Sequence, residues 1–206
     1  MKKIILLIML FALDISAQTV YELPFASKGN QIELEVANTS PKAIDNVSVD
    51  VDSAPEWINF ENLQSVVGEL IGERESAALF EFSVDKRAPV GEEGKIVFNI
   101  ASAAGDTWKK TINVTVSRPE NYELTQNYPN PFNPTTKIEF VLPVDEKVTL
   151  KVYDMLGREV TTLINEVLAA GHHDVEFNAS NIASGTYIYV VSTPNFKQIK
   201  KMMLIK

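Results

Sequence analysis

Few residues of this 206-residue chain carry the side chains that catalysis or metal binding usually requires. There is no cysteine, and the two histidines are the neighbours His172 and His173. Neighbouring residues of a strand point to opposite faces, so this pair is poorly placed to ligate one ion. Residues 18–118 contain neither histidine nor cysteine, and therefore no nucleophile and base pair of the serine or cysteine type. The sequence predicts no metal site and no cofactor.

Carboxylates are the remaining candidates for chemistry. Asp50 and Asp52 alternate with valines and would share one strand face, where they could bind Ca²⁺ or act as an acid and base pair. Glu69, Glu73 and Glu75 form a similar acidic patch within the expected loop 69–76. A solvated polar surface explains both groups, so we interpret the chain as non-catalytic. A small surface enzyme that uses Asp50 and Asp52 remains the alternative.

Charge is unevenly distributed along the chain. Nineteen Lys and Arg face 27 Asp and Glu, which gives a net charge of −8 and argues against nucleic acid as a partner. Four lysines nevertheless gather at the C-terminal end, at positions Lys197, Lys200, Lys201 and Lys206. Lysines on an edge strand protect it against unwanted pairing, and they could equally contribute to recognition.

The first 17 residues have the pattern of a secretory leader. Lys2 and Lys3 precede an uncharged run, Ile4–Leu13, which Asp14 interrupts before a small residue at Ala17. The run is shorter than the roughly 20 apolar residues of a membrane span. We expect a signal peptide over 1–17 that is cleaved after Ala17.

The elements between residues 18 and 118 are predicted to be strands. Ile32, Leu34 and Val36 alternate with polar residues, and similar period-two segments recur between turn residues up to Val116. Loops are expected at 69–76 and 88–91. Six or seven strands in about 100 residues are typical of an immunoglobulin-like β-sandwich, and the lack of cysteine excludes only the disulfide-bonded type.

A second domain is expected over 119–206, after the polar segment 117–121. Three prolines between residues 129 and 134 stiffen a loop that leads into a strand. A hairpin turn is predicted at 153–158, with Gly157 at positive φ. The following segment fits helical spacing, but its β-branched residues favour a strand to about Ile164 and then a loop to Gly171. Residues 185–191 read as a strand buried on both faces, and 196–206 as the last strand. The fold class predicted for the whole chain is all-β, with two immunoglobulin-like β-sandwich domains after the signal peptide.

Several motifs of this second domain occur together in one known family. They are Tyr128-Pro129-Asn130-Pro131-Phe132-Asn133-Pro134-Thr135-Thr136, Tyr153-Asp154 with Leu156-Gly157-Arg158-Glu159-Val160, Ala170-Gly171-His172, Ala183-Ser184-Gly185-Thr186-Tyr187, and the basic tail. Residues 122–206 closely resemble the type A C-terminal sorting domain of the type IX secretion system of Bacteroidetes and related phyla. A related module occurs in flagellar hook-capping proteins, which lack a leader.

The resemblance implies a route and partners. The leader would take the chain into the periplasm, the type IX outer-membrane translocon would recognise the folded C-terminal domain, and a sortase would remove it. The protein would then be released or displayed on the outer cell surface. The residues that the resemblance assigns to sorting-signal recognition are Gly185, Tyr187, Lys200, Lys201 and Lys206.

The role of residues 18–118, the passenger, is less constrained. We expect a non-catalytic module that binds a surface glycan or a protein ligand, or that has a structural role. A structural part of a surface appendage and the carboxylate-dependent enzyme both remain open.

Overall fold

The computed structural model describes residues 3–9 and 19–206, and side chains from residue 19 onward. All regular elements of this described part are strands, so the all-β prediction is confirmed. The chain divides into two compact units, residues 1–117 and 118–206, called here the first and the second unit. No helix in the described ranges is long and apolar enough to cross a membrane.

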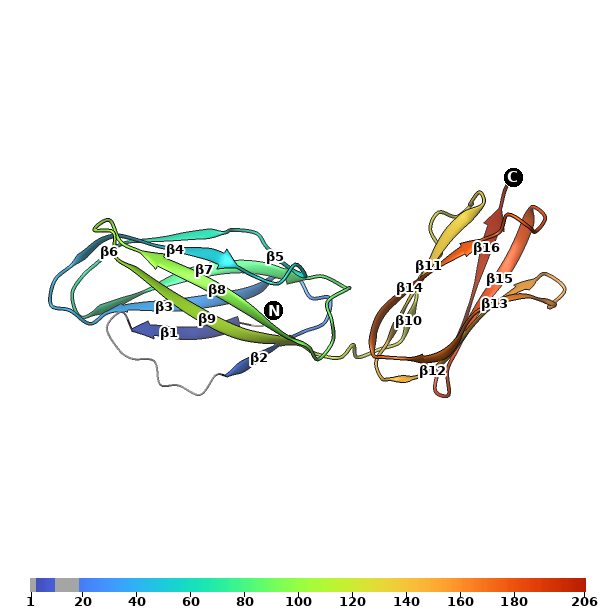
Figure 1. Cartoon of the computed structure of the whole chain (residues 1–206), viewed down its shortest axis with the longest axis horizontal. Helices are drawn as coiled ribbons and strands as arrows, with labels where there is room; N and C mark the ends of the chain where they lie inside the picture. Colours follow the sequence, from blue (N-terminus) through green and yellow to red (C-terminus); the bar gives the residue numbers. More distant parts are fainter. Residues whose placement is uncertain (1–2, 10–18) are drawn as a thin grey trace. The chain divides into compact units, whose positions relative to one another are not determined.

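The first unit consists of two facing sheets (Figure 1). One sheet has the order β1–β3–β7–β5, with β1 (Lys3–Met9), β3 (Asn30–Asn38), β7 (Arg74–Val84) and β5 (Ile58–Phe60). The other has the order β2–β9–β8–β4–β6, with β2 (Val20–Leu23), β9 (Thr107–Val116), β8 (Glu93–Ala101), β4 (Ile44–Ser53) and β6 (Gln64–Leu70). β1 and β2 each pair in parallel with a neighbour, β3 and β9, whereas the other pairings within these sheets are antiparallel.

The core between these sheets follows from the alternation in the sequence. Ile32, Leu34 and Val36 are fully buried, while the polar residues between them are half-buried on the other face. Phe80 and Phe98 from opposite sheets meet at 4.9 Å between ring centroids. This inward face of apolar side chains accounts for the two-layer arrangement.

The sequence analysis missed strand β6. Residues 69–76 were expected to form one exposed loop, but β6 ends at Leu70 and β7 begins at Arg74. β6 lies at a sheet edge and its pairing with β4 shifts register near Gly68, which has a φ of +83°. The shift interrupts period-two alternation, so the strand carries no clean pattern. Glu69, Glu73 and Glu75 are exposed, as a solvated surface requires, but two of them lie in strands.

The segment 3–9 falls within the expected signal peptide, and it forms β1 beside β3. The expected cleavage point after Ala17 lies outside the described residues. Removal of the leader therefore stays a prediction.

The second unit also contains two sheets that enclose one core. The smaller has the order β10–β11–β14, with β10 (Glu123–Leu124), β11 (Thr135–Leu142) and β14 (Gly171–Asn178). The larger has the order β13–β12–β15–β16, with β13 (Glu159–Leu168), β12 (Glu146–Asp154), β15 (Gly185–Ser192) and β16 (Lys197–Leu204). All neighbours are antiparallel. The C-terminal strand thus forms one edge of the larger sheet.

Two expectations for this unit were wrong. β13 continues to Leu168, where it pairs with Glu146, so residues 165–168 are strand rather than loop. A register shift at Leu150/Lys151 offsets the alternation of β13, which is why its apolar residues imitate helical spacing. β15 was expected to be buried on both faces, yet only alternate residues are buried, and Thr186, Ile188 and Val190 lie on a partly exposed face.

Candidate functional site

Four of the five predicted recognition residues lie on β15 and β16, and Lys206 follows β16. β15 and β16 pair from Ser192 with Lys197 to Gly185 with Leu204. Met202 and Leu204 are almost fully buried, so alternate residues of β16 belong to the core of the second unit. The C-terminal tail is therefore part of the fold and not an appended peptide.

A loop of residues 128–134, called here the proline loop, covers the outer edge of β16. The Phe132 N–H donates to the Met203 carbonyl at 2.9 Å, and the Ile205 N–H donates to the Phe132 carbonyl at 3.0 Å. The Asn130 Oδ1 atom accepts a bond from the Met203 N–H at 2.9 Å. Phe132 itself is buried, and the peptide bonds before Pro129 and Pro131 are cis. These contacts satisfy backbone groups that an edge strand would otherwise leave open.

A buried polar network fixes the base of the proline loop. The Tyr189 hydroxyl donates to the Thr125 carbonyl at 2.8 Å and accepts from the Asn127 N–H at 2.9 Å. Asn127 Nδ2 donates to Thr136 Oγ1 at 2.9 Å and to the Pro129 carbonyl at 3.0 Å. Tyr189 is fully buried, and this burial raises the pKa of its phenol to about 12. The loop is thus tied to β15 through one aromatic hydroxyl.

Lys206 is held by the chain itself. Its ammonium group donates to the carbonyls of Ser180 at 2.7 Å and Ile182 at 2.5 Å, and its N–H donates to Ser184 Oγ at 3.1 Å. These bonds fasten the end of the chain to the loop that precedes β15. Lys206 in this position stabilises the tail, and its side chain is engaged within the domain.

Gly185 and Tyr187 also have structural explanations. Gly185 has a φ of +155° at the start of β15, a conformation that favours glycine. Tyr187 is 8% exposed, and its hydroxyl donates to the Ala183 carbonyl at 2.7 Å. Both residues shape β15 and the loop before it.

Lys200 and Lys201 are neighbours in sequence that lie on different faces of β16. Lys200 shares the face of the buried Met202 and is half-buried, whereas Lys201 is exposed on the outward face, opposite Ile188. Of the five predicted recognition residues, Lys201 is therefore the one whose side chain is fully available on the outer sheet surface. The structure pairs the two strands that carry four of these residues, and it separates Lys201 from those that have contacts within the fold, which the sequence did not.

Asp154 closes the hairpin turn between β12 and β13. The Asp154 carboxylate accepts bonds from the N–H groups of Leu156 at 2.9 Å and Arg158 at 3.0 Å, and from Arg158 Nε at 2.7 Å. Partial burial raises the pKa of Asp154, but these bonds outweigh it and hold the pKa below its ordinary value. Gly157 has a φ of +79°, which confirms the predicted turn glycine.

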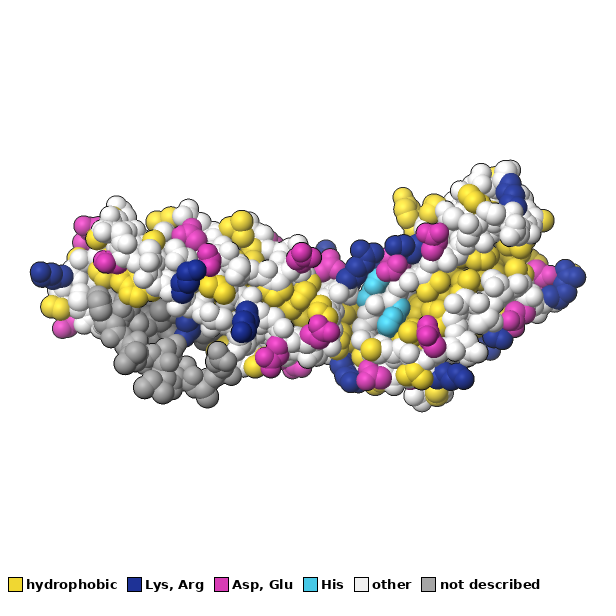
Figure 2. Space-filling model, viewed as in Figure 1, with side chains coloured by type: hydrophobic (Ala, Val, Ile, Leu, Met, Phe, Trp, Pro, Cys, Tyr) yellow, Lys and Arg dark blue, Asp and Glu magenta, His cyan; other side chains and the backbone are white. Residues whose placement is uncertain are grey.

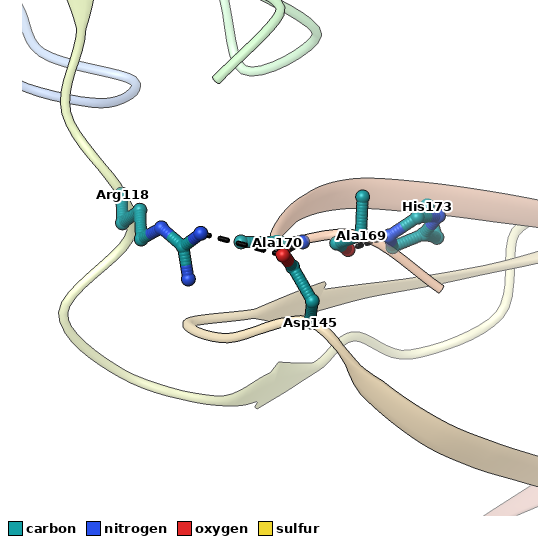
Figure 3. A network of polar contacts seen from close by, with 5 residues as sticks. All are labelled: Arg118, Asp145, Ala169, Ala170 and His173. Atoms are coloured by element: carbon teal, nitrogen blue, oxygen red, sulfur yellow. Dashed lines mark hydrogen bonds and ion pairs between the residues drawn. The ribbon is translucent and has the colours of Figure 1, made fainter. Parts of the chain in front are cut away.

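The start of the second unit is anchored at the end of the sandwich that holds the β13–β14 turn (Figure 3). Asp145 accepts a bond from the Ala170 N–H at 2.7 Å and forms an ion pair with Arg118 at 3.3 Å. His173 Nε2 lies 2.8 Å from the Ala169 carbonyl in the same turn, and its ring stacks on Phe140. His173 therefore has contacts within the fold that account for its position.

His172 lies on the other face of β14, as strand geometry predicts for neighbours. Its Nε2 atom is 3.5 Å from Glu139 Oε2, and its side chain is nearly buried. In Figure 2 the two histidines are the cyan side chains, with acidic and basic side chains near them. Nowhere in the described residues do three or more His, Asp or Glu side chains form a group that could hold a metal ion.

In the first unit, the carboxylates considered for chemistry lie on β4. Asp52 Oδ2 forms an ion pair with Lys109 at 2.9 Å, and Asp50 Oδ2 lies 3.4 Å from Ser48 Oγ. The ion pair is exposed on both sides, so it contributes little to stability. The pairing of β4 with β8 shifts register between Val51 and Ser53. The regular alternation of β4 is therefore interrupted at Asp52.

Sequence reasoning missed the polar residues beneath the proline loop. The residues concerned are Tyr189, Asn127 and Thr136, whose types are common in strands and turns. They lie in segments that are distant in sequence and meet only in the folded unit. The one available signal was a second tyrosine two residues after Tyr187, on the same strand face.

Residues 126–206 match the family described as the secretion system C-terminal sorting domain. The match indicates that this unit is a sorting domain and that the chain is exported to the cell surface or secreted. The search of curated proteins found no match.

Among solved structures, the chain is similar to latent PorU from Porphyromonas gingivalis, with 13% identity, 93% of this chain and 19% of PorU covered, and a TM-score of 0.34. It is also similar to PorZ, a surface component of the type-IX secretion system of the same organism, with 21% identity, 53% and 15% covered, and a TM-score of 0.31. The chain thus spans less than a fifth of the length of either protein.

Proposed function

We propose that this chain is a cargo of the type IX secretion system, in which the second unit is the sorting domain and residues 18–118 are the exported passenger. The observation that carries the proposal is the family match over residues 126–206, which covers the proline loop, the hairpin and the tail. A signal peptide at 1–17 would supply the first step, and the outer-membrane translocon and a sortase would act afterwards on the outer cell surface.

The passenger in this proposal is a non-catalytic, immunoglobulin-like module that binds a surface glycan or protein, or that has a structural role. Its two sheets and shared core support the sandwich assignment. Its candidate carboxylate Asp52 is engaged by Lys109, which supports an ordinary surface role for this residue. Retention of residues 18–118 on a glycan array without turnover would agree with this role. Turnover that Asp50→Ala abolishes would contradict it.

Fractionation in a host with a type IX apparatus tests the export proposal. The full chain should reach the surface or the medium, and a chain that lacks residues 118–206 should remain in the periplasm. A matched control fuses residues 118–206 to an unrelated exported protein, which should then be secreted. Secretion of the truncated chain at the full-length level would refute the sorting role.

A further inference from the structure

The larger sheet of the second unit has one face that no element of the unit covers. Tyr187, Tyr189 and Val191 of β15 point into the core, so the residues between them point outward. The registers with β12 and β16 align these outward residues in rows. We call the following set the open face: Lys151, Tyr153, Thr186, Ile188, Val190, Ile199, Lys201 and Met203.

The centre of the open face is apolar. Val190 lies between Lys151 and Ile199, and Ile188 lies between Tyr153 and Lys201. Ile199 is 56% exposed and Met203 is 46% exposed. The solvated face of an antiparallel sheet is normally polar, and adjoining exposed apolar residues typically mark an interaction site.

Basic residues surround this apolar centre. Lys147, Lys151, Lys197 and Lys201 lie on the outward side of the larger sheet, where the carboxylate of Glu159 forms an ion pair with Lys151 at 2.8 Å. The outward side of the smaller sheet is acidic, with Glu123, Glu139, Asp174 and Glu176 around Lys137. The two outer surfaces of this sandwich therefore differ in charge, and the exposed apolar residues of β16 are on the basic one.

We propose that the open face docks the second unit onto a protein of the secretion machinery whose complementary surface is apolar at its centre and acidic at its edge. This inference rests on the proposed function, since it names the contact through which the sorting domain is recognised. An apolar centre with a charged rim is the anatomy of a protein interface, and lysines favour an acidic partner. Lys201 contributes to this contact, whereas Lys200 lies on the other face of β16 and Lys206 bonds within the fold.

The test is secretion of full-length variants in a host with a type IX apparatus. The double variant Ile199→Glu/Met203→Glu places carboxylates at two exposed positions and should fold, yet its secretion should fall at least about tenfold, the effect of losing 1.4 kcal/mol of binding. Lys201→Glu should reduce secretion several-fold. Amide hydrogen exchange of the purified proteins should show the second unit folded in each case.

Two matched controls separate the open face from the rest of the domain. Leu156→Glu changes a 79% exposed apolar residue on the β12–β13 turn, and Lys137→Glu reverses a lysine on the acidic sheet. Both should leave secretion within about twofold of the parent, because neither lies on the open face. Equal losses for Leu156→Glu and the double variant would overturn the inference.

Failure of this inference is distinguishable from failure of the proposed function. Normal secretion of the folded double variant, with periplasmic retention of the chain that lacks residues 118–206, would overturn the docking face alone. Secretion of the truncated chain would overturn both. Two other outcomes would reassign the face, in each case with secretion unchanged. If the double variant loses a dimer that the parent forms in sedimentation equilibrium, the face serves self-association. If it loses binding to phosphatidylglycerol vesicles, the face binds lipid.

Discussion

Replacement of Tyr189 by phenylalanine should destabilise the second unit through one lost hydroxyl. That group satisfies the Thr125 carbonyl and the Asn127 N–H beneath the proline loop, in a fully buried position. Leaving a buried donor or acceptor unsatisfied costs about 1–3 kcal/mol each, so we expect a loss of about 2–4 kcal/mol. This is a large part of the stability of a small domain.

The same hydroxyl should make the stability of the second unit depend on pH. The folded-state pKa of Tyr189 is raised from 10.0 to about 12, so its protonated form is favoured by folding. Its stabilising contribution is complete below pH 10 and is lost as the pH rises toward 12, and it amounts to at most about 3 kcal/mol. The difference in stability between the parent and Tyr189→Phe should therefore shrink over this interval.

The assay is a urea titration of the full chain, followed by amide hydrogen exchange of peptides from residues 118–206. With a slope of about 1 kcal/mol per molar urea, the midpoint of the second unit should fall by about 2 M or more. Both tryptophans, Trp57 and Trp108, lie in the first unit, so their fluorescence should report an unchanged transition there. Tyr187→Phe is the matched control, because its hydroxyl makes one bond to Ala183 and should cost about 1 kcal/mol. If Tyr189→Phe costs no more than this control, the role of the buried network is refuted.

Three further substitutions test local features of the fold. Gly157→Ala forces a side chain into a φ of +79° and should cost about 1 kcal/mol in the second unit, seen in the same titration. The Asp154 carboxylate stabilises the hairpin above the ordinary carboxyl pKa of 3.8, and this contribution is lost as the pH falls through the lower folded-state pKa. Asp154→Asn should remove it, so the protection of the turn amides against hydrogen exchange should no longer fall at acid pH. In the first unit, Gly72→Ala would place Cβ 2.5 Å from the Pro41 carbonyl oxygen. The urea midpoint of the tryptophan fluorescence transition should therefore fall by about 1–3 M at the slope used above. An unchanged midpoint would mean that the turn shifts freely.

The fold was predictable where one physical signal dominated. Period-two alternation located β3, because Ile32, Leu34 and Val36 face a core while their neighbours face outward. It failed at β6, where register shifts offset the pattern, and for β13, whose shifts opposite Leu150/Lys151 and Val152/Tyr153 lie before the residues that were expected to form a loop. A register shift depends on how two strands pair, so the residue pattern of one strand alone does not predict it.

For the predicted recognition residues, the structure shows where each side chain lies, and their role in recognition stays a prediction. Motif resemblance pointed to β15, β16 and the tail, and the structure pairs these segments. The roles depend on which way each side chain points: Tyr187 and Lys206 bond within the domain, while Lys201 lies outward. Strand alternation places Lys200 and Lys201 on opposite faces, but which of the two faces outward depends on how β16 packs against the rest of the unit.

This division of roles changes how recognition by the tail must be tested. Deletion of residues 196–206 would remove all of β16, including the buried Met202 and Leu204, and would release the proline loop from its bonds to Met203 and Ile205. Each buried side chain of this size contributes about 2–5 kcal/mol, so the truncated domain would unfold whatever its partner recognises. Loss of secretion after that deletion is expected both for a tail that is read directly and for a tail that only completes the sandwich. Substitutions at Ile199, Lys201 and Met203 avoid this ambiguity, because they alter an outward surface and leave the buried half of the same strand unchanged.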